Sequence, residues 1–148
     1  MEIKQISDIN EALEILWKHD QANQKINFPK DSPNYELFKK SMLESYKGQS
    51  EGFLLIYENS KIIGSMLLRI KNNQFRKQKY GEVWYIYLDN SCRGKGYGTK
   101  LLKFADEYFK SKGCEYAFAG VSAFNPASNA LFDKSGYKLT RKILEKPY

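Results

Sequence analysis

The chain has 148 residues, 42% of them hydrophobic and 15% aromatic, which is enough to bury a core and excludes a disordered chain. Its net charge of +7, from 24 Lys and Arg against 17 Asp and Glu, favours anionic ligands such as phosphates and nucleic acid. It has no membrane-length apolar run, no signal-peptide pattern and only two cysteines, so we expect one cytoplasmic domain, 1–148, with no disulfide framework and no membrane partner.

The first part of the chain predicts a short strand and two helices. Residues 1–6 alternate weakly, as a strand does, and two prolines at 27–33 predict a loop between the helices, because proline disfavours helix in the residue before it. The second helix should end near Gly48. Side chains that can cap the helices are Asp8 or Asn10 for the first and Ser32 or Asn34 for the second.

The rest of the chain alternates strands and helices. The predicted strands are 53–57, 62–70, 80–88, 116–121 and 137–144, with helices at 99–112 and 126–133. The order β-α-α-β-β-β-α-β-α-β predicts an α/β (α+β) fold. We expect a mixed central sheet of six to seven strands flanked by about four helices, which cover both faces.

A glycine-rich loop joins the strand at 80–88 to the helix that follows. Its residues are Arg93, Gly94, Lys95, Gly96, Tyr97, Gly98 and Thr99. The first turn of a helix has N–H groups without intrahelical partners, and its dipole favours negative charge. Glycines let a ligand approach the main chain, and Arg and Lys add positive charge. The loop therefore predicts a site for a diphosphate-bearing ligand.

Two familiar glycine-rich loops do not match this sequence. A P-loop needs Gly-x-x-x-x-Gly-Lys followed by Ser or Thr, and the chain has no such string. A dinucleotide-binding fingerprint needs Gly-x-Gly-x-x-Gly in the first βαβ unit. Here the spacing is Gly94-x-Gly96-x-Gly98, after three earlier strands, so that interpretation also fails.

The loop and a second pattern resemble the GNAT superfamily of acetyl-coenzyme A-dependent N-acetyltransferases. Its signature is Gln or Arg, two residues, Gly, one residue, then Gly or Ala, and Arg93, Gly96 and Gly98 match it. Residues 129–137, Asn-Ala-Leu-Phe-Asp-Lys-Ser-Gly-Tyr, look like the family's second pattern, an Asn and Ala before aromatic residues and a Gly-aromatic end. The element order is also similar, so the resemblance covers nearly the whole chain.

The resemblance implies how acetyl-coenzyme A would bind as co-substrate. Main-chain N–H groups of the loop Arg93–Thr99 would hold the pyrophosphate. In this family the strand at 80–88 and the one at 116–121 splay apart, and the cofactor enters the gap. The resemblance implies that the strand edge at Ile86, Tyr87 and Leu88 would bind its pantetheine arm. It also implies contacts to the arm from Asn129, with Asn125 and Phe132 close to Asn129. Asn125 is equally suited to capping a helix.

Acetyl transfer needs a proton acceptor for the amine and a donor for the oxyanion. The backbone N–H of Leu88 is the natural oxyanion donor, by resemblance and by its place at the strand end. Glu82 is the candidate general base. It lies six residues before Leu88, so on a regular strand both side chains would share a face, and some histone acetyltransferases of this superfamily place a Glu there. Glu82 could equally be an exposed strand-start residue or bind the acceptor.

One position departs from the family. Many members have a Tyr as general acid where this chain has Phe132, which has no proton to give. The thiol of coenzyme A is a fair leaving group, so the reaction could run without a dedicated acid. Water could replace the general acid. Tyr87 and Tyr137 are weaker substitutes, and Tyr137 is better suited to a place in the core than to the role of acid.

Other reactive residues give little support to different chemistry. His19 is the only histidine, which argues against a His-based triad and against a zinc site, so no metal is expected. Cys92 lies beside the loop and could be a nucleophile, but direct transfer to the acceptor is the family's usual route.

The acceptor is expected to be a small-molecule or peptide amine. Residues that the family's acceptor side offers are Trp17, Asp20, Phe28, Tyr35, Tyr80 and Trp84, and aromatics with an acidic residue suit a cationic amine. Two alternatives stay open: a non-catalytic sensor that binds coenzyme A or acyl-coenzyme A, consistent with Phe132, and an RNA-associated protein, consistent with the net charge and with the basic stretch 61–81. We do not expect nucleic acid as the main partner. Dimers are common in the family, but no residue here fixes a homodimer.

Overall fold

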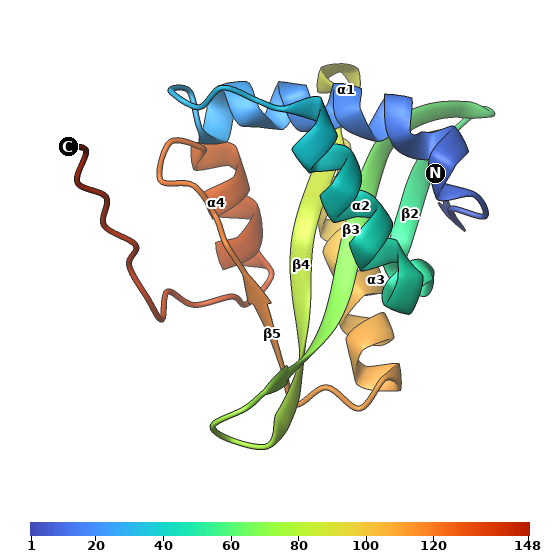
Figure 1. Cartoon of the computed structure of the whole chain (residues 1–148). Coiled ribbons are helices and arrows are strands. Elements are labelled where there is room, and N and C mark those ends of the chain that lie inside the picture. The colour runs from blue at the N-terminus through green and yellow to red at the C-terminus, as the bar shows by residue number, and fades with distance from the viewer.

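The computed structural model contains five strands and four α-helices (Figure 1). They follow the order β1(Glu2–Gln5), α1(Ile9–Asn27), α2(Tyr35–Gln49), β2(Phe53–Glu58), β3(Lys61–Asn73), β4(Gln78–Leu88), α3(Tyr97–Ser111), β5(Tyr116–Ala119) and α4(Pro126–Lys134). None of the helices is both long and apolar enough to cross a membrane.

The strands form one mixed sheet in the order β1-β2-β3-β4-β5. Neighbouring strands are antiparallel from β1 to β4, whereas β5 is parallel to β4 because α3 carries the chain back across the sheet. The predicted α/β class and the order of elements up to α4 are confirmed.

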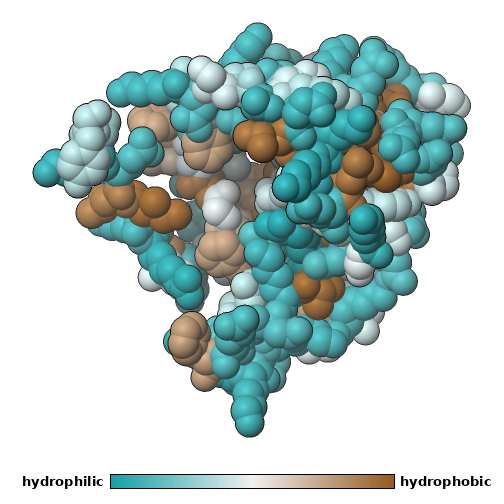
Figure 2. All heavy atoms as spheres, viewed as in Figure 1, coloured by the Kyte–Doolittle hydropathy of each residue, from teal (hydrophilic) through white to brown (hydrophobic).

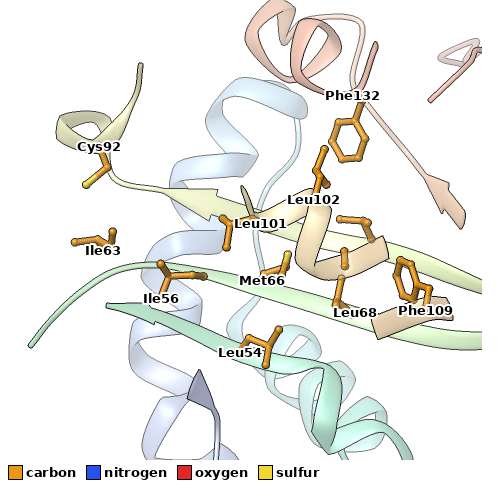
Figure 3. Packing of buried hydrophobic residues seen from close by; sticks show 12 residues of the cluster. Leu54, Ile56, Ile63, Met66, Leu68, Cys92, Leu101, Leu102, Phe109 and Phe132 are labelled. Atoms are coloured by element: carbon orange, nitrogen blue, oxygen red, sulfur yellow. The ribbon is translucent and has the colours of Figure 1, made fainter. Parts of the chain in front are cut away.

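Helices cover both faces of the sheet, as predicted. On one face α1 and α2 pack against β2 and β3 around Leu16, Phe53 and Leu67, which are almost fully buried. On the other face α3 brings Leu101 and Leu102 onto side chains from β2 and β3 (Figure 3). Both faces of the sheet are therefore covered, and its two edge strands are β1 and β5.

The predicted final strand at 137–144 is wrong, so the sheet has five strands instead of six to seven. After α4 the chain continues as an extended tail that pairs with no strand, and its end lies away from the sheet (Figure 1). A strand needs a partner for its N–H and C=O groups, which alternation in the sequence cannot supply. The apolar residues of this segment, Leu139, Ile143 and Leu144, are exposed.

For each of the first two helices, one of the two predicted side chains forms the N-terminal cap. Asp8 caps α1 by accepting from the N–H of Asn10 at 2.9 Å, and Asn34 caps α2 by accepting from the N–H of Leu37 at 3.1 Å. Asp8 fixes where α1 begins, and Asn34 fixes where the loop between α1 and α2 ends. That loop forms one wall of the site described below.

A bulge in the middle of β4 changes which way its side chains point. Leu67 lies opposite Tyr85 and Leu68 lies opposite Val83, so Trp84 is an extra residue between two pairs. An extra residue shifts the alternation of side chains by one position. Side chains an even number of residues apart therefore point to opposite faces of the sheet when Trp84 lies between them.

Candidate active site

The two parallel strands, β4 and β5, separate where the predicted site lies. β4 and β5 pair only from Tyr80–Tyr116 to Val83–Ala119. β4 then continues to Leu88 with β3 as its only neighbour. The structure thus shows the splay that the resemblance implies, and it leaves one edge of the end of β4 open.

Main-chain groups at the end of β4 face this open edge. The N–H of Asp89 donates to the carbonyl of Ile63 on the β3 side at 2.8 Å. Because successive N–H groups of a strand point to opposite edges, the N–H of Leu88 points toward the gap. The carbonyl of Ile86 accepts from the side chain of Asn23 on α1 at 3.0 Å, also from outside the β3 ladder. The N–H of Leu88 thus has the orientation that an oxyanion donor in the gap requires, and this role stays a prediction.

The glycine-rich loop presents unbonded N–H groups. Gly94 and Gly96 both have φ +76, a left-handed conformation that favours glycine, and nothing lies within 4 Å of a Cβ at either position. The first helical hydrogen bond of α3 runs from the N–H of Lys100 to the carbonyl of Gly96 at 3.2 Å. The N–H groups of residues 94–99 therefore donate to no protein acceptor and can receive an anion.

The third glycine of the loop, Gly98, is required by packing and not by a left-handed conformation. A Cβ on Gly98 would lie 2.9 Å from the side chain of Leu131, so glycine here lets α4 pack closely against α3. Glu58 at the end of β2 accepts from the Tyr97 hydroxyl and lies 3.6 Å from the Lys95 ammonium. These contacts fix the first turn of α3 while leaving its main-chain donors free.

A cavity of about 520 Å³ adjoins the splay. α1, the loop after it, α2, the centre of β4, the segment after β5 and α4 all contribute to its walls. Figure 2 shows this side of the surface hollowed between α4 and α2, with apolar side chains visible inside. Of the predicted acceptor residues, Trp17, Asp20, Phe28 and Trp84 line the cavity.

Two predicted acceptor residues lie outside the cavity lining. Tyr80 stacks on Tyr116 with ring centroids 5.1 Å apart, at the end of the sheet where β4 and β5 are still paired. Tyr35 packs edge-on against Trp17 at 5.3 Å and supports the wall from behind. Both are packing residues in this structure.

A polar stripe on α1 faces the cavity, and the sequence analysis named only its first member, Asp20, and missed Asn23 and Asn27. Asp20, Asn23 and Asn27 follow one another at helical spacing and all line the cavity. Burial raises the pKa of the Asp20 carboxyl, opposed in part by the Gln24 side chain. The three- and four-residue spacing of these polar side chains was the signal that could have identified them.

His19 anchors this part of α1 to the sheet. Its Nδ1 lies 2.8 Å from the hydroxyl of Ser65 on β3, both residues are buried, and its ring stacks on Tyr87 at 4.3 Å. Burial lowers the pKa of His19 to about 4; the charge of Asp89 opposes this shift and the charge of Lys18 adds to it, both to a smaller extent. A neutral His19 is a packing and hydrogen-bonding residue that holds Asp20 and Asn23 in place.

We expect the stability of the protein to fall as the pH drops from 6.5 to 4. In this window the unfolded chain binds a proton at His19 that the folded chain excludes, so the free energy of unfolding falls by about 3 kcal/mol. Urea denaturation at several pH values measures it. The variant His19→Gln should lose this dependence, and equal pH slopes for both proteins would show that His19 is not its source.

The predicted common face of Glu82 and Leu88 is wrong, because the bulge at Trp84 lies between them. Glu82 accepts from Arg69 at 2.7 Å and lies 3.2 Å from the Lys71 ammonium. Arg69 in turn stacks over the Trp84 ring at 3.8 Å. Glu82 does not line the cavity, and its role as general base stays a prediction.

The variant Glu82→Gln separates these roles. We expect it to lower the free energy of unfolding by about 1–3 kcal/mol, because Arg69 loses a largely buried charged partner. We expect kcat/KM to stay near that of the unchanged protein across the pH range. A fall of about 100-fold or more with loss of the acidic limb would establish Glu82 as the base.

The residues of α4 are held mainly by contacts within the protein. Asn125 caps the helix by accepting from the N–H of Ser128 at 3.0 Å, as its alternative role predicted. Asn129 donates to the carbonyls of Ser122 and Asn125, both at 2.8 Å. These bonds fix the segment after β5 to α4, and their roles toward a cofactor stay predictions.

Phe132 is buried and lines the cavity, whereas Tyr137 does not. The two rings meet edge to face at 5.0 Å, and the buried Tyr137 hydroxyl has no hydrogen-bond partner. Burial raises the pKa of Tyr137 to about 12. Tyr137 is therefore a core residue behind Phe132, and Cys92 is likewise buried in the core cluster away from the cavity.

Residues 10–137 match the model of the acetyltransferase (GNAT) family. The chain belongs to this family. An uncharacterized N-acetyltransferase of Methanocaldococcus jannaschii is 25% identical over 132 residues, which cover 88% of this chain and 57% of that protein. A mycothiol acetyltransferase of Renibacterium salmoninarum is 29% identical over 99 residues, 66% of this chain and 29% of that protein. The GNAT chain thus spans only part of the length of these relatives.

Solved structures show the same fold. The aminoglycoside antibiotic 6'-N-acetyltransferase of Acinetobacter haemolyticus aligns with 100% of this chain and 98% of its own, with a TM-score of 0.75 and 18% sequence identity. The structural likeness supports the fold, the match over residues 10–137 gives the family, and the acceptor is a separate question.

Proposed function

We propose that this GNAT protein transfers an acetyl group from acetyl-coenzyme A directly to a primary amine. The observation that carries the proposal is the glycine-rich loop, whose N–H groups from Gly94 to Thr99 donate to no protein acceptor. They lie at the start of a helix, beside Arg93 and Lys95, where a pyrophosphate fits by charge and by hydrogen bonding. The neighbouring splay of β4 from β5 supports a place for the pantetheine arm.

When bound, acetyl-coenzyme A supplies a thioester whose C–S bond breaks as the C–N bond to the acceptor forms, with the sulfur leaving as thiolate. The loop 93–99 would hold the diphosphate, and the edge of β4 between Ile86 and Leu88 that β5 leaves unpaired would bind the arm. The N–H of Leu88 donates to the developing oxyanion from a position already facing the gap. Asn125, Asn129 and Phe132 would border the arm on the α4 side.

The acceptor amine occupies the cavity between α1, α2 and β4. An amine must lose a proton to react, and its free pKa is near ~10.4. Asp20 lines the cavity, and burial raises the pKa of its carboxyl, which suits a proton acceptor better than the ion-paired Glu82. Asp20 takes the amine proton directly or through a water.

Phe132 gives a second candidate function, a sensor that binds coenzyme A without catalysis, because it places no acid near the leaving sulfur. A thiol-release assay with acetyl-coenzyme A and a panel of amines separates the two. The proposal predicts amine-dependent thiol release and an acetylated product by mass spectrometry. Binding of acetyl-coenzyme A by calorimetry with no release for any amine would establish the sensor instead.

A further inference from the structure

The charges around the cavity differ in sign from those of the protein as a whole. The chain has a net charge of +7, yet its cavity lining contains two carboxylates, Asp20 and Asp31, and no Lys, Arg or His. Neither carboxylate forms an ion pair with a basic residue of the protein, whereas Glu51, Glu58 and Glu82 all do. The cavity is thus an acidic region without internal neutralisation.

The two carboxylates come from different walls. Asp20 lies on α1, one helical turn before Asn23, whose amide reaches the carbonyl of Ile86 at the splay. Asp31 is exposed and lies in the loop between α1 and α2. Asp20 therefore lies on the helix that contacts β4 at the splay, and Asp31 lies on a separate part of the wall.

A tyrosine lies beside Asp20 in the same cavity. The side chain of Tyr85 lines the cavity, and its hydroxyl is buried. Burial raises the pKa of this hydroxyl, and the charge of Asp20 raises it further, so Tyr85 adds no charge to the wall. The two carboxylates therefore set the charge of the cavity, and they favour a ligand with positive charge at more than one point.

We propose that the acceptor is a small amine with a second positive charge, such as a linear diamine or an amino sugar. This inference rests on the proposed function and names the class of its acceptor. Asp20 faces the amine that reacts, and Asp31 holds the second ammonium group. The aromatic wall formed by Trp17, Phe28 and Phe38 borders the carbon chain between the two charges.

Three compounds of equal chain length test the charge preference in the thiol-release assay. They are 1,4-diaminobutane, butylamine and 4-aminobutyrate, whose second groups are positive, absent and negative. We expect kcat/KM for the diamine to exceed that for butylamine by about tenfold, and the amino acid to be about tenfold worse than butylamine. An amino sugar with several amines is assayed beside them, and its kcat/KM relative to that of the diamine shows which of the two kinds of acceptor the cavity prefers.

A matched pair of variants locates the second charge. Asp31→Asn should lower kcat/KM for the diamine more than kcat/KM for butylamine, so that the preference falls to within about twofold, because the second ammonium group loses its charged partner. Glu107→Gln removes the same charge from an exposed position on α3 and should change neither. Equal kcat/KM for diamine and butylamine, or a preference that survives Asp31→Asn, would overturn the inference.

Failure of the proposed function would look different. In that case none of the amines, butylamine included, would release thiol. Calorimetric titration of the diamine and of butylamine into the protein with coenzyme A present then decides the charge preference without catalysis. Tighter binding of the diamine that weakens in Asp31→Asn supports the acceptor class, and equal binding refutes it.

Discussion

The variant Gly96→Val is expected to lose about 100-fold in affinity for coenzyme A, or about 2.8 kcal/mol. Gly96 has φ +76 and directly precedes α3, and a branched side chain is strained in that conformation. Relief of the strain rotates the adjoining peptides, so the N–H groups that face a diphosphate turn away. Isothermal titration calorimetry measures the loss.

The chain contains a matched control for this experiment. Gly113 follows the other end of α3, also has φ +76 and also has nothing within 4 Å of a Cβ. Gly113→Val should therefore lose a similar free energy of unfolding, about 1–2 kcal/mol, while it binds coenzyme A as the unchanged protein does. Equal losses of affinity in the two variants would mean that general destabilisation, and not the loop, explains the result.

The variant Phe132→Tyr is expected to raise kcat about tenfold. Phe132 lines the cavity, so a hydroxyl added there can protonate the leaving sulfur, and general acids commonly contribute ~10²-fold or more when the leaving group is poor. A thiolate is a better leaving group, hence the smaller gain. Steady-state kinetics at saturating amine measures it.

Tyr137→Phe is the control for this gain. The Tyr137 hydroxyl lies behind Phe132 and has no hydrogen-bond partner, so its removal should leave kcat unchanged and not lower stability. If Tyr137→Phe lowers kcat, Tyr137 is already the acid. If Phe132→Tyr folds, binds coenzyme A and gains nothing, the reaction does not lack an acid.

The glycine-rich loop could be predicted from the sequence because its constraints are local. Positive φ at Gly94 and Gly96 requires glycine, and a strand before it and an amphipathic helix after it define its context. The order of elements up to α4 could be read in the same way. The caps Asp8 and Asn34 were among the predicted side chains for the same reason.

Features that depend on distant parts of the chain could not be predicted. The bulge at Trp84 arises from the register between β3 and β4, so the even spacing of Glu82 and Leu88 gave the wrong face. The segment 137–144 alternates as a strand would, but no neighbouring strand pairs with it. The cavity forms where β4, the segment after β5 and α4 meet α1 and the loop after it, and only the packed fold brings these parts together.

The central claim is that main-chain N–H groups of the loop 93–99 bind the diphosphate. Nuclear magnetic resonance of the nitrogen-15-labelled protein, titrated with coenzyme A, observes these groups directly. The account predicts downfield shifts of the amide protons of Gly94, Gly96 and Gly98 with one common dissociation constant, as each loop donor gains a charged acceptor. Saturable binding that shifts other amides and leaves those of the loop unchanged would contradict it.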